Sequence, residues 1–395
     1  MSVVNQNIDS TALFVIQPTN FCNIDCGYCY LADRVSKNSM PFEVADRIAD
    51  RIIEHKDYLT KKTVVSWHAG EPLSVGISKL GRYFDIFEKL HDHGIVFEHS
   101  VQTNAMLINQ RFAEMFAKRK IKVGVSVDGS QEQHDYYRRT RGGKGTFEKV
   151  KSGIEILHRN AVSVSAIAVI HQKTFRDPDA FYDSMLDLGI PYVGLNVLEV
   201  EGASRTSYLT SDDPRAEFEN FIEQVFKRSI NDGSLAIREL VRVLKTIMFP
   251  KIKAKSAEAA TGRIITINHE GDFSTFSPEL IDHEVLDLGN HIIGNVDGSG
   301  FLTSLRRATT STYATEIRRG VEKCSSDCEY FDYCGGGAPA NKLLENGAFN
   351  STETAFCRYT VKSIFDVALR MIAEDSSLLE RAAQAQWWKL LYEEL

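Results

Sequence analysis

Cys22, Cys26 and Cys29 fall within eight residues and carry the clearest chemical signal in the sequence. A loop this short can bring three thiolates to one soft metal centre. A four-iron cluster normally takes four thiolates, yet the next cysteine along the chain is Cys324. The spacing therefore indicates a cluster with one iron left open to a ligand that is not protein. A zinc site is the alternative, although such sites usually close with a fourth Cys or His nearby, and the next histidine is His55.

The other four cysteines form a second group toward the C-terminal end. They are Cys324, Cys328, Cys334 and Cys357. Four thiolates complete the ligand set of a second iron–sulfur cluster, which would be closed to outside ligands. A zinc site is again the alternative. All seven cysteines thus lie in two groups, as metal ligands do and as the scattered partners of disulfides do not.

Polar residues also stand where predicted strands end. Gly70 would allow a close backbone approach, Glu71 offers an acceptor for an ammonium group, and Arg138 could hold a carboxylate. The residues of this kind are Gly70, Glu71, Asn104, Ser126, Arg138 and Asn196. Each is a weak signal alone, but their recurrence at successive strand ends indicates a binding site.

The strands that would position these residues are short apolar runs separated by amphipathic helical stretches. We predict six strands at residues 12–16, 63–67, 97–102, 123–127, 164–170 and 192–197. Strand–helix alternation implies parallel pairing with right-handed crossovers. The sequence therefore predicts an α/β fold, a partial (β/α)6 barrel of the TIM-like kind, with functional groups on the loops at its C-terminal face.

The predicted barrel occupies only part of the chain. We assign it to residues 11–232, followed by a bridging region over 233–300 that contains a helix (237–249) and a hairpin (264–276). Residues 301–395 hold the second cysteine group and a C-terminal helix. A chain of 395 residues is long enough for two domains or for one barrel with an appendage.

Composition limits the partners. A net charge of −7 and the lack of a basic run argue against nucleic acid. The short polar N-terminal stretch does not resemble a signal peptide, and no apolar stretch reaches the roughly 18 residues that a membrane span needs. We expect a cytoplasmic protein with no membrane partner.

The cysteine loop resembles that of the radical S-adenosylmethionine (SAM) enzymes, whose pattern is Cys-x3-Cys-x-aromatic-Cys with Tyr28 here as the aromatic residue. In that family the open iron of a [4Fe-4S] cluster chelates SAM, and an electron from the cluster yields a 5′-deoxyadenosyl radical. The resemblance implies that Ala69-Gly70-Glu71 binds the SAM amine, Ser126 its ribose and Arg138 its carboxylate. The residues that we predict to bind the cofactor are Tyr28, Gly70, Glu71, Asn104, Ser126, Arg138 and Asn196.

The C-terminal region resembles the SPASM extension of radical SAM enzymes that modify peptides. The full extension has seven cysteines, which hold two auxiliary clusters. The four cysteines present here match the second auxiliary cluster, whereas Ala338 and Phe276 stand where the first would need cysteines. The resemblance implies two [4Fe-4S] clusters in all, one that binds SAM and one auxiliary.

A narrower resemblance covers nearly the whole chain. Residues 15–19, 67–72, 273–280, 334–338 and 345–347 are similar to the cyclophane-forming peptide maturases associated with glycine-rich-repeat precursors. That family abstracts a β-carbon hydrogen from a ribosomally synthesised precursor peptide and joins the carbon to an aromatic ring, which forms a three-residue cyclophane. The resemblance implies an oxidoreductase of this type, with an electron donor such as flavodoxin or ferredoxin.

Carbon–carbon bond formation on a ring leaves one electron and one proton to remove. An auxiliary cluster could take the electron, and a carboxylate could take the proton. Glu199 and Glu201 follow the sixth predicted strand and are our candidates for this catalytic base. The region of Asp272 and Glu279 is the alternative.

Two other functions stay open. A thioether-forming or sulfatase-maturing relative would keep the radical machinery but need a Cys or Ser at the modified position of its substrate. A non-catalytic iron–sulfur electron carrier is disfavoured by the intact set of three cysteines and by Glu71.

Overall fold

A computed structural model describes residues 8–31, 33–199, 214–282, 284–285 and 289–392. All six predicted strands are present, with ends that differ slightly from the sequence prediction. They are β1 (Thr11–Ile16), β2 (Leu59–Trp67), β3 (Phe97–Thr103), β4 (Lys122–Ser126), β5 (Val164–Ile170) and β6 (Tyr192–Val197). Each pairs in parallel with the next along the chain, so the predicted fold class is confirmed.

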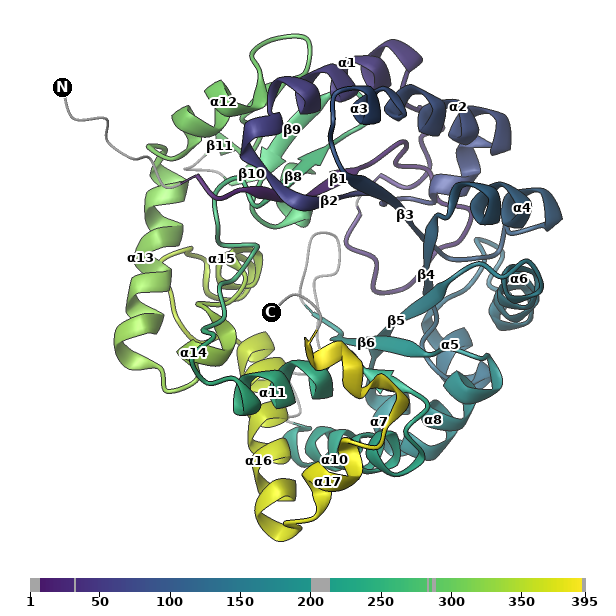
Figure 1. Ribbon diagram of the computed structural model, residues 1–395, viewed down its shortest axis with the longest axis vertical. Coiled ribbons are helices and arrows are strands. Elements are labelled where there is room, and N and C mark those ends of the chain that lie inside the picture. The colour runs from purple at the N-terminus through teal and green to yellow at the C-terminus, as the bar shows by residue number, and fades with distance from the viewer. Residues whose placement is uncertain (1–7, 32, 200–213, 283, 286–288, 393–395) are drawn as a thin grey trace.

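Helices connect these strands and cover the outer face of the sheet (Figure 1). They are α1 (Phe42–Glu54), α2 (Ile77–Phe87), α3 (Lys89–Asp92), α4 (Gln110–Arg119), α5 (Gln131–Tyr137), α6 (Phe147–Arg159), α7 (Gln172–Arg176), α8 (Pro178–Asp187) and α10 (Arg215–Asp232). In α1 the buried residues Ala45, Ile48, Ala49 and Ile52 recur at helical spacing on one face. Two short 3-10 turns, η1 (Lys56–Tyr58) and η2 (Pro72–Val75), flank β2.

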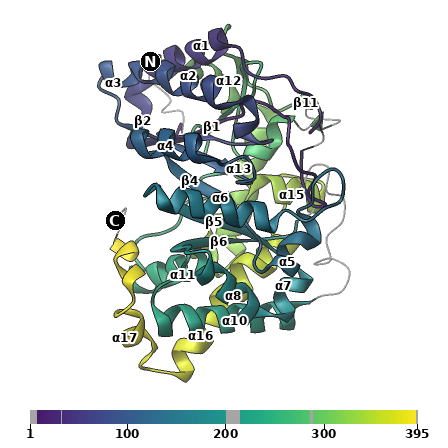
Figure 2. The ribbon, with the colours of Figure 1, turned by 90° about the vertical axis from the view of Figure 1, so that its right-hand side faces the viewer.

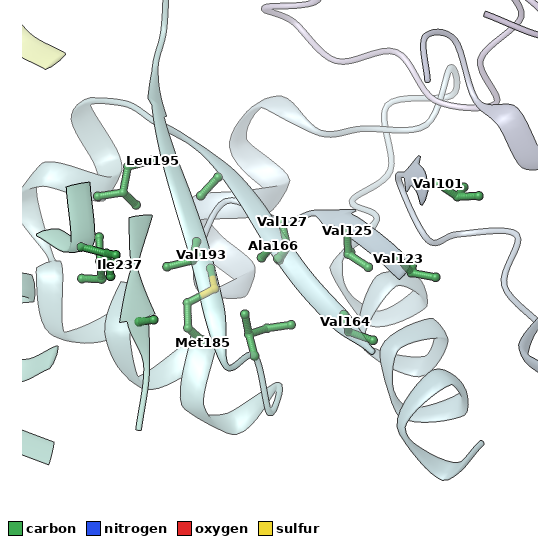
Figure 3. Close-up of a cluster of buried hydrophobic side chains, with 14 of the residues drawn as sticks. Val101, Val123, Val125, Val127, Val164, Ala166, Met185, Val193, Leu195 and Ile237 are labelled. Atoms are coloured by element: carbon green, nitrogen blue, oxygen red, sulfur yellow. The ribbon is translucent and has the colours of Figure 1, made fainter. Parts of the chain in front are cut away.

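Strand alternation separates the core from the lumen of the barrel. Val123 and Val125 of β4 and Val164 and Ala166 of β5 point to the helices, where Figure 3 shows them packed with their neighbours. The intervening residues of β5 are only partly buried, in strict alternation. The lumen side of each strand is therefore free to carry polar and functional side chains.

The sheet is extended at both edges by segments that follow the six strands in sequence. The two-residue β7 (Ala236–Ile237) adds to β6, and β8 (Ile264–Ile267) pairs in parallel with β1. The predicted hairpin is present, because β8 continues antiparallel into β9 (Asp272–Thr275), which pairs with β12 (Gly294–Asn295). β10 (Glu284–Val285) and β11 (Gly289–Asn290) form a separate pair. The hairpin of the bridging region thus becomes part of the barrel sheet.

The rest of the chain is mostly helical and lies across the open side of the sheet (Figure 1). Its elements are α11 (Arg238–Met248), η3 (Pro278–Asp282), α12 (Phe301–Ala308), α13 (Thr312–Asp327), α14 (Phe331–Cys334), α15 (Pro339–Asn346), the π-helix η4 (Cys357–Ser363), α16 (Ile364–Glu374), α17 (Leu378–Ala382) and η5 (Gln386–Tyr392). Figure 2 shows α16 beside α10, against which it packs. Within the described residues, no helix is both long and apolar enough to cross a membrane.

Candidate active site and cluster-binding residues

The loop with Cys22, Cys26 and Cys29 follows β1 and is pinned by the segment after α5. Backbone N–H groups of Asp25 and Gly27 donate to the carbonyls of Arg139 and Tyr137, at 2.7 and 3.1 Å. All three cysteines line one cavity of about 270 Å³ at the C-terminal ends of the strands. Burial is the main cause that raises the pKa of the Cys22 thiol to about 11 and that of Cys26 to about 12. Ligation of a metal would therefore have to release these protons.

Two donors from other parts of the barrel point at the sulfurs of this loop. Asn104 Nδ2 lies 3.7 Å from Cys22 Sγ, and Arg138 Nη1 lies 4.0 Å from Cys26 Sγ. Within the described residues, no three His, Cys, Asp or Glu side chains converge closely enough to hold a single ion. The shared cavity and the donors aimed at sulfur nevertheless fit a cluster bound through thiolates, which such donors stabilise.

The loop after β2 comes into direct backbone contact with the cysteine loop at Gly70. A Cβ there would lie 2.7 Å from the carbonyl oxygens of Thr19 and Phe21, and Gly70 has a φ of 55°. Any side chain would therefore collide with the backbone that leads into the cysteine loop. Ala69 also has a positive φ, of 71°, a strain of about 1 kcal/mol or more.

Glu71 is fully buried, and three donors of the chain hold its carboxylate. Oε1 accepts from Leu73 N–H (3.0 Å) and Thr103 Oγ1 (2.8 Å), and Oε2 accepts from Asn104 N–H (2.8 Å). Burial raises the pKa of Glu71 to about 7, against the effect of these hydrogen bonds. The cavity wall here is formed by Ala69 and Gly70. That the carboxylate itself binds the SAM amine stays a prediction, and this geometry favours a role in holding the loop after β2 to the end of β3.

Arg138 follows α5 and is held by Asp128, which lies just beyond β4. Arg138 Nε donates to Asp128 Oδ2 at 2.8 Å, and the hydroxyl of Tyr28 donates to the same oxygen at 2.6 Å. The other carboxylate oxygen, Asp128 Oδ1, accepts from Val169 N–H at 2.9 Å. Burial acts to raise the pKa of Asp128, but the charges of Arg138 and His134, together with the hydrogen bonds from Arg138 and Tyr28, leave that pKa lowered. Asp128 thus fixes both Tyr28 and Arg138, and it is a site residue that we did not predict.

The remaining predicted contacts also lie on the cavity wall. Asn104 Nδ2 donates to Asn23 Oδ1 at 2.8 Å, Ser126 Oγ accepts from Gln102 Nε2 at 3.0 Å, and Asn196 Oδ1 accepts from Arg238 Nη2 at 2.8 Å. The structure therefore brings the following predicted residues to one cavity: Cys22, Cys26, Tyr28, Cys29, Gly70, Asn104, Ser126, Arg138, Asn196 and Glu199.

Glu199 lies where this cavity meets a second chamber of about 590 Å³ between the barrel and the C-terminal region. Its Oε2 accepts from Asn341 Nδ2 on α15. Burial, with added repulsion from Glu279 and Glu258, raises the pKa of Glu199 to about 8, although the bond from Asn341 opposes this. The second candidate base, Glu201, lies outside the described residues.

The four C-terminal cysteines line a smaller cavity of about 30 Å³. Cys324 lies in the last turn of α13, Cys328 directly follows this helix, Cys334 ends α14, and Cys357 begins η4. Burial raises the pKa of Cys357 to about 12, with further contributions from Cys334 and Cys328. The four cysteines share the lining of one cavity, and this donor set fits a cluster with four thiolate ligands.

Glycines shape the backbone around Cys334. Gly335, Gly336 and Gly337 all have positive φ, and a Cβ at Gly335 would lie 2.5 Å from the backbone nitrogen of Ser256. Burial raises the pKa of Cys334, while N–H groups of Gly336 and Gly337 directed at its sulfur act to lower it. Two backbone amides thus approach the sulfur of this cysteine.

Phe276 and Ala338 replace the cysteines that a first auxiliary cluster would need. Phe276 is buried at a φ of 76° and packs edge-on against Tyr313, with ring centroids 5.9 Å apart. It belongs to a small apolar cluster with Leu280 and Phe349. Ala338 precedes α15 and lines both the chamber and the cysteine cavity.

Comparison with known proteins agrees with this geometry. The sequence model of the radical SAM superfamily matches residues 16–185. The uncharacterized protein sll1766 of Synechocystis sp. is 34% identical over 380 residues, which cover 94% of each chain. The serine-type anaerobic sulfatase-maturating enzyme of Klebsiella aerogenes is 24% identical over 324 residues, 81% of this chain and 77% of that enzyme.

Two solved structures share the fold. One is anSMEcpe with bound AdoMet, which is SAM, at a TM-score of 0.74 and 20% identity over 94% of this chain and 99% of that one. The other is Streptococcus suis SuiB bound to the precursor peptide SuiA, at a TM-score of 0.61 and 18% identity over 89% and 77%. The chain belongs to the radical SAM superfamily, which supports SAM and a [4Fe-4S] cluster as its cofactors. That the three-cysteine loop holds this cluster stays a prediction.

Proposed function

We propose that this chain is a radical SAM maturase of a ribosomally synthesised precursor peptide. It removes a hydrogen from a β-carbon and joins that carbon to a nearby aromatic ring, which gives a three-residue cyclophane. The observation that supports this function best is the position of Glu199. Its carboxylate lies on the cavity of the three-cysteine loop and also on the chamber that reaches Cys334.

The chemistry explains why that position matters. SAM and the cluster, when bound, supply a radical that takes one hydrogen atom from the peptide. Attack of the β-carbon on the ring then leaves one proton and one electron in excess. A carboxylate with a pKa of about 8 is a better proton acceptor than an ordinary one. A cluster on the four C-terminal cysteines would supply an electron acceptor on the far side of the same chamber.

The other residues of the site bind and orient. Arg138, held by Asp128, presents a fixed cation to the SAM carboxylate. Asn104, Ser126 and Asn196 line the same cavity with neutral polar groups. Reduction of the first cluster requires an external donor such as flavodoxin or ferredoxin.

A peptide substrate is consistent with the named relatives. The Klebsiella aerogenes relative is a sulfatase-maturating enzyme, and SuiB has been solved with a precursor peptide. Sulfatase-type maturation is therefore the second candidate, and the sequence similarity over 81% of this chain favours it. Phe276 and Ala338, which stand in place of two cysteines, fit the cyclophane-forming function better. Loss of the first auxiliary cluster is usual in the cyclophane family that the sequence resembles.

The test compares two sets of peptides under reducing conditions with SAM. One set comes from small reading frames beside the gene that contain repeated aromatic-x-x motifs, and the other carries the Ser or Cys of a sulfatase motif. We expect the first set to lose two hydrogens and to resist fragmentation between the joined residues. Deuterium placed on the β-carbon should appear in 5′-deoxyadenosine. A product aldehyde that reacts with a hydrazine, formed only from the second set, would favour the sulfatase function instead.

A further inference from the structure

The cavity of the four C-terminal cysteines contains a buried ammonium group. Lys342 lies on α15 and is only 4% exposed, and its Nζ donates to Cys324 Sγ at 3.4 Å. Among the described residues, no carboxylate lies within ion-pair distance of this ammonium. A buried charge without a counter-charge is costly, so the position of Lys342 calls for an anion at the cysteines.

The surrounding chain leaves room for this side chain. A Cβ at Gly320, on α13, would lie 3.2 Å from Lys342 Nζ, and a Cβ at Gly337 would lie 3.9 Å from Lys342 Cε. The remaining wall of the cavity includes the apolar side chains of Phe331 and Phe356. In such a weakly polar environment a fixed charge acts strongly on its neighbours.

A second lysine near the same cysteines is arranged differently. Lys362, in η4, donates to the carboxylate of Glu353 and is 28% exposed. Its charge is therefore both neutralised by a partner and screened by solvent. Lys362 lies close enough to line a neighbouring pocket with Cys324 and Cys357, which makes it a matched control for Lys342.

We propose that Lys342 sets the reduction potential of the auxiliary cluster through its charge-assisted hydrogen bond to Cys324. An electron added to a cluster makes the cluster and its thiolates one charge more negative. A fixed cation at a ligand sulfur stabilises that reduced form and so raises the potential. Lys342 is thus a positioning residue that makes the cluster a better one-electron acceptor.

The consequence for catalysis rests on the proposed function. There the peptide, after its β-carbon has bonded to the ring, is oxidised by one electron, the auxiliary cluster is reduced, and the proton goes to Glu199. The effect of Lys342 on the potential does not depend on which peptide is modified.

The test is a redox titration of the reconstituted full-length protein, followed by electron paramagnetic resonance. A second sample with Cys22, Cys26 and Cys29 replaced by Ala isolates the auxiliary signal. We expect Lys342→Gln to shift the reduction equilibrium about tenfold toward the oxidised cluster, which is about 59 mV for one electron. Lys342→Arg, which keeps the charge, and Lys362→Gln should each shift it less than threefold.

Iron content and the shape of the resonance signal separate this role from a purely structural one. A shift of less than threefold in Lys342→Gln with normal iron would overturn the proposal, as would an equal shift in Lys362→Gln. Loss of the cluster from both Lys342→Gln and Lys342→Arg would also overturn it, because the side chain would then be a structural tie. No peptide is present in this titration, so its result is independent of whether the product is a cyclophane.

Discussion

The two cysteine regions differ in how their ligands are assembled. In the barrel, Cys22, Cys26 and Cys29 share one loop, and the donors to their sulfurs are Asn104 after β3 and Arg138 after α5. In the C-terminal region the four cysteines come from separate elements, and their donors come from nearby turns and from α15. The first set borders a cavity of about 270 Å³ and the second a cavity of about 30 Å³. The first is suited to a cluster with an outside ligand, and the second to a cluster that only exchanges electrons.

The cations beside the two cysteine sets also differ, in whether a carboxylate neutralises them. Arg138, next to Cys26, is paired with Asp128, whereas Lys342, next to Cys324, has no carboxylate partner among the described residues. A paired cation can orient a ligand without changing the local net charge. An unpaired cation changes the net charge around the cysteines that it contacts. A basic side chain can therefore serve a different purpose at each of the two cysteine sets.

The largest effect should follow from breaking the first set. In Cys26→Ala two thiolates remain, which cannot hold the cluster that binds SAM, so we expect 5′-deoxyadenosine formation to fall below detection. The auxiliary cluster should persist, since none of its ligands lies in the barrel. Chromatographic quantification of 5′-deoxyadenosine, alongside iron analysis, measures both. Retained SAM cleavage in this variant would contradict the assignment.

Breaking the second set should separate cleavage from cross-linking. Cys357→Ala should lose about half the iron of a protein with two four-iron clusters and should keep some SAM cleavage. Cross-linked peptide should fall about 100-fold or more, because the electron left after ring attack has no acceptor. Mass spectrometry of the peptide and iron analysis of the protein check this. Full cross-linking, or reconstitution to about twelve irons in the unaltered chain, would refute a single auxiliary cluster.

Removing the carboxylate between the two sets should have a smaller effect. Glu199→Gln should lower cross-linked product about 100-fold, the size of a general-base contribution, while SAM cleavage continues. In the unaltered protein the base acts only when ionised, so product formation should rise with pH through a midpoint near the Glu199 pKa of about 8. The variant should lack this rise. An unchanged pH profile would point to the Asp272 and Glu279 region as the source of the base.

Glu71 tests how the loops around the first set are held. In Glu71→Gln an amide NH₂ group takes the place of one carboxylate oxygen. One of the N–H and O–H donors that bind the Glu71 carboxylate then faces another donor. We expect the affinity for SAM to fall about tenfold, comparable to one lost hydrogen bond to a charged group, with the cluster retained. Glu98→Gln, on the lysine-paired carboxylate of β3, is the control. Equal affinity in all three proteins would show that Glu71 only forms a turn.

The smallest effect should be on stability. The folded-state pKa of Glu199 is raised from 4.5 to about 8, so the folded protein favours the protonated form. The contribution of Glu199 to the stability of the folded protein is therefore greatest below pH 4.5, and it is lost as the pH rises toward 8. Glu199→Gln should remove this loss and be relatively more stable than the unaltered chain at pH 8 and above. Denaturant unfolding at a series of pH values measures the difference, and parallel curves would contradict it.

The sequence by itself determined the local chemistry of this protein. The spacing of Cys22, Cys26 and Cys29 and the alternation of apolar runs depend on neighbouring residues, so they predicted the cysteine loop and all six strands. Short motifs such as Gly70-Glu71 also marked the right loops, because strand ends meet at one face of a parallel sheet. The hairpin at residues 264–276 was likewise predicted from its own pattern.

Only the tertiary structure decided how these parts meet. Nothing local shows that β8 pairs with β1, or that Asp128 holds Tyr28 and Arg138. The raised pKa of Glu199 depends on burial and on Glu279 and Glu258, which come from later in the chain. Lys342 has no sequence signal at all, because its role comes from the cysteine that it contacts and from the lack of a carboxylate partner in the described part of the chain. Burial and long-range neighbours set these electrostatic properties, and neither is written in the spacing of residues along the chain.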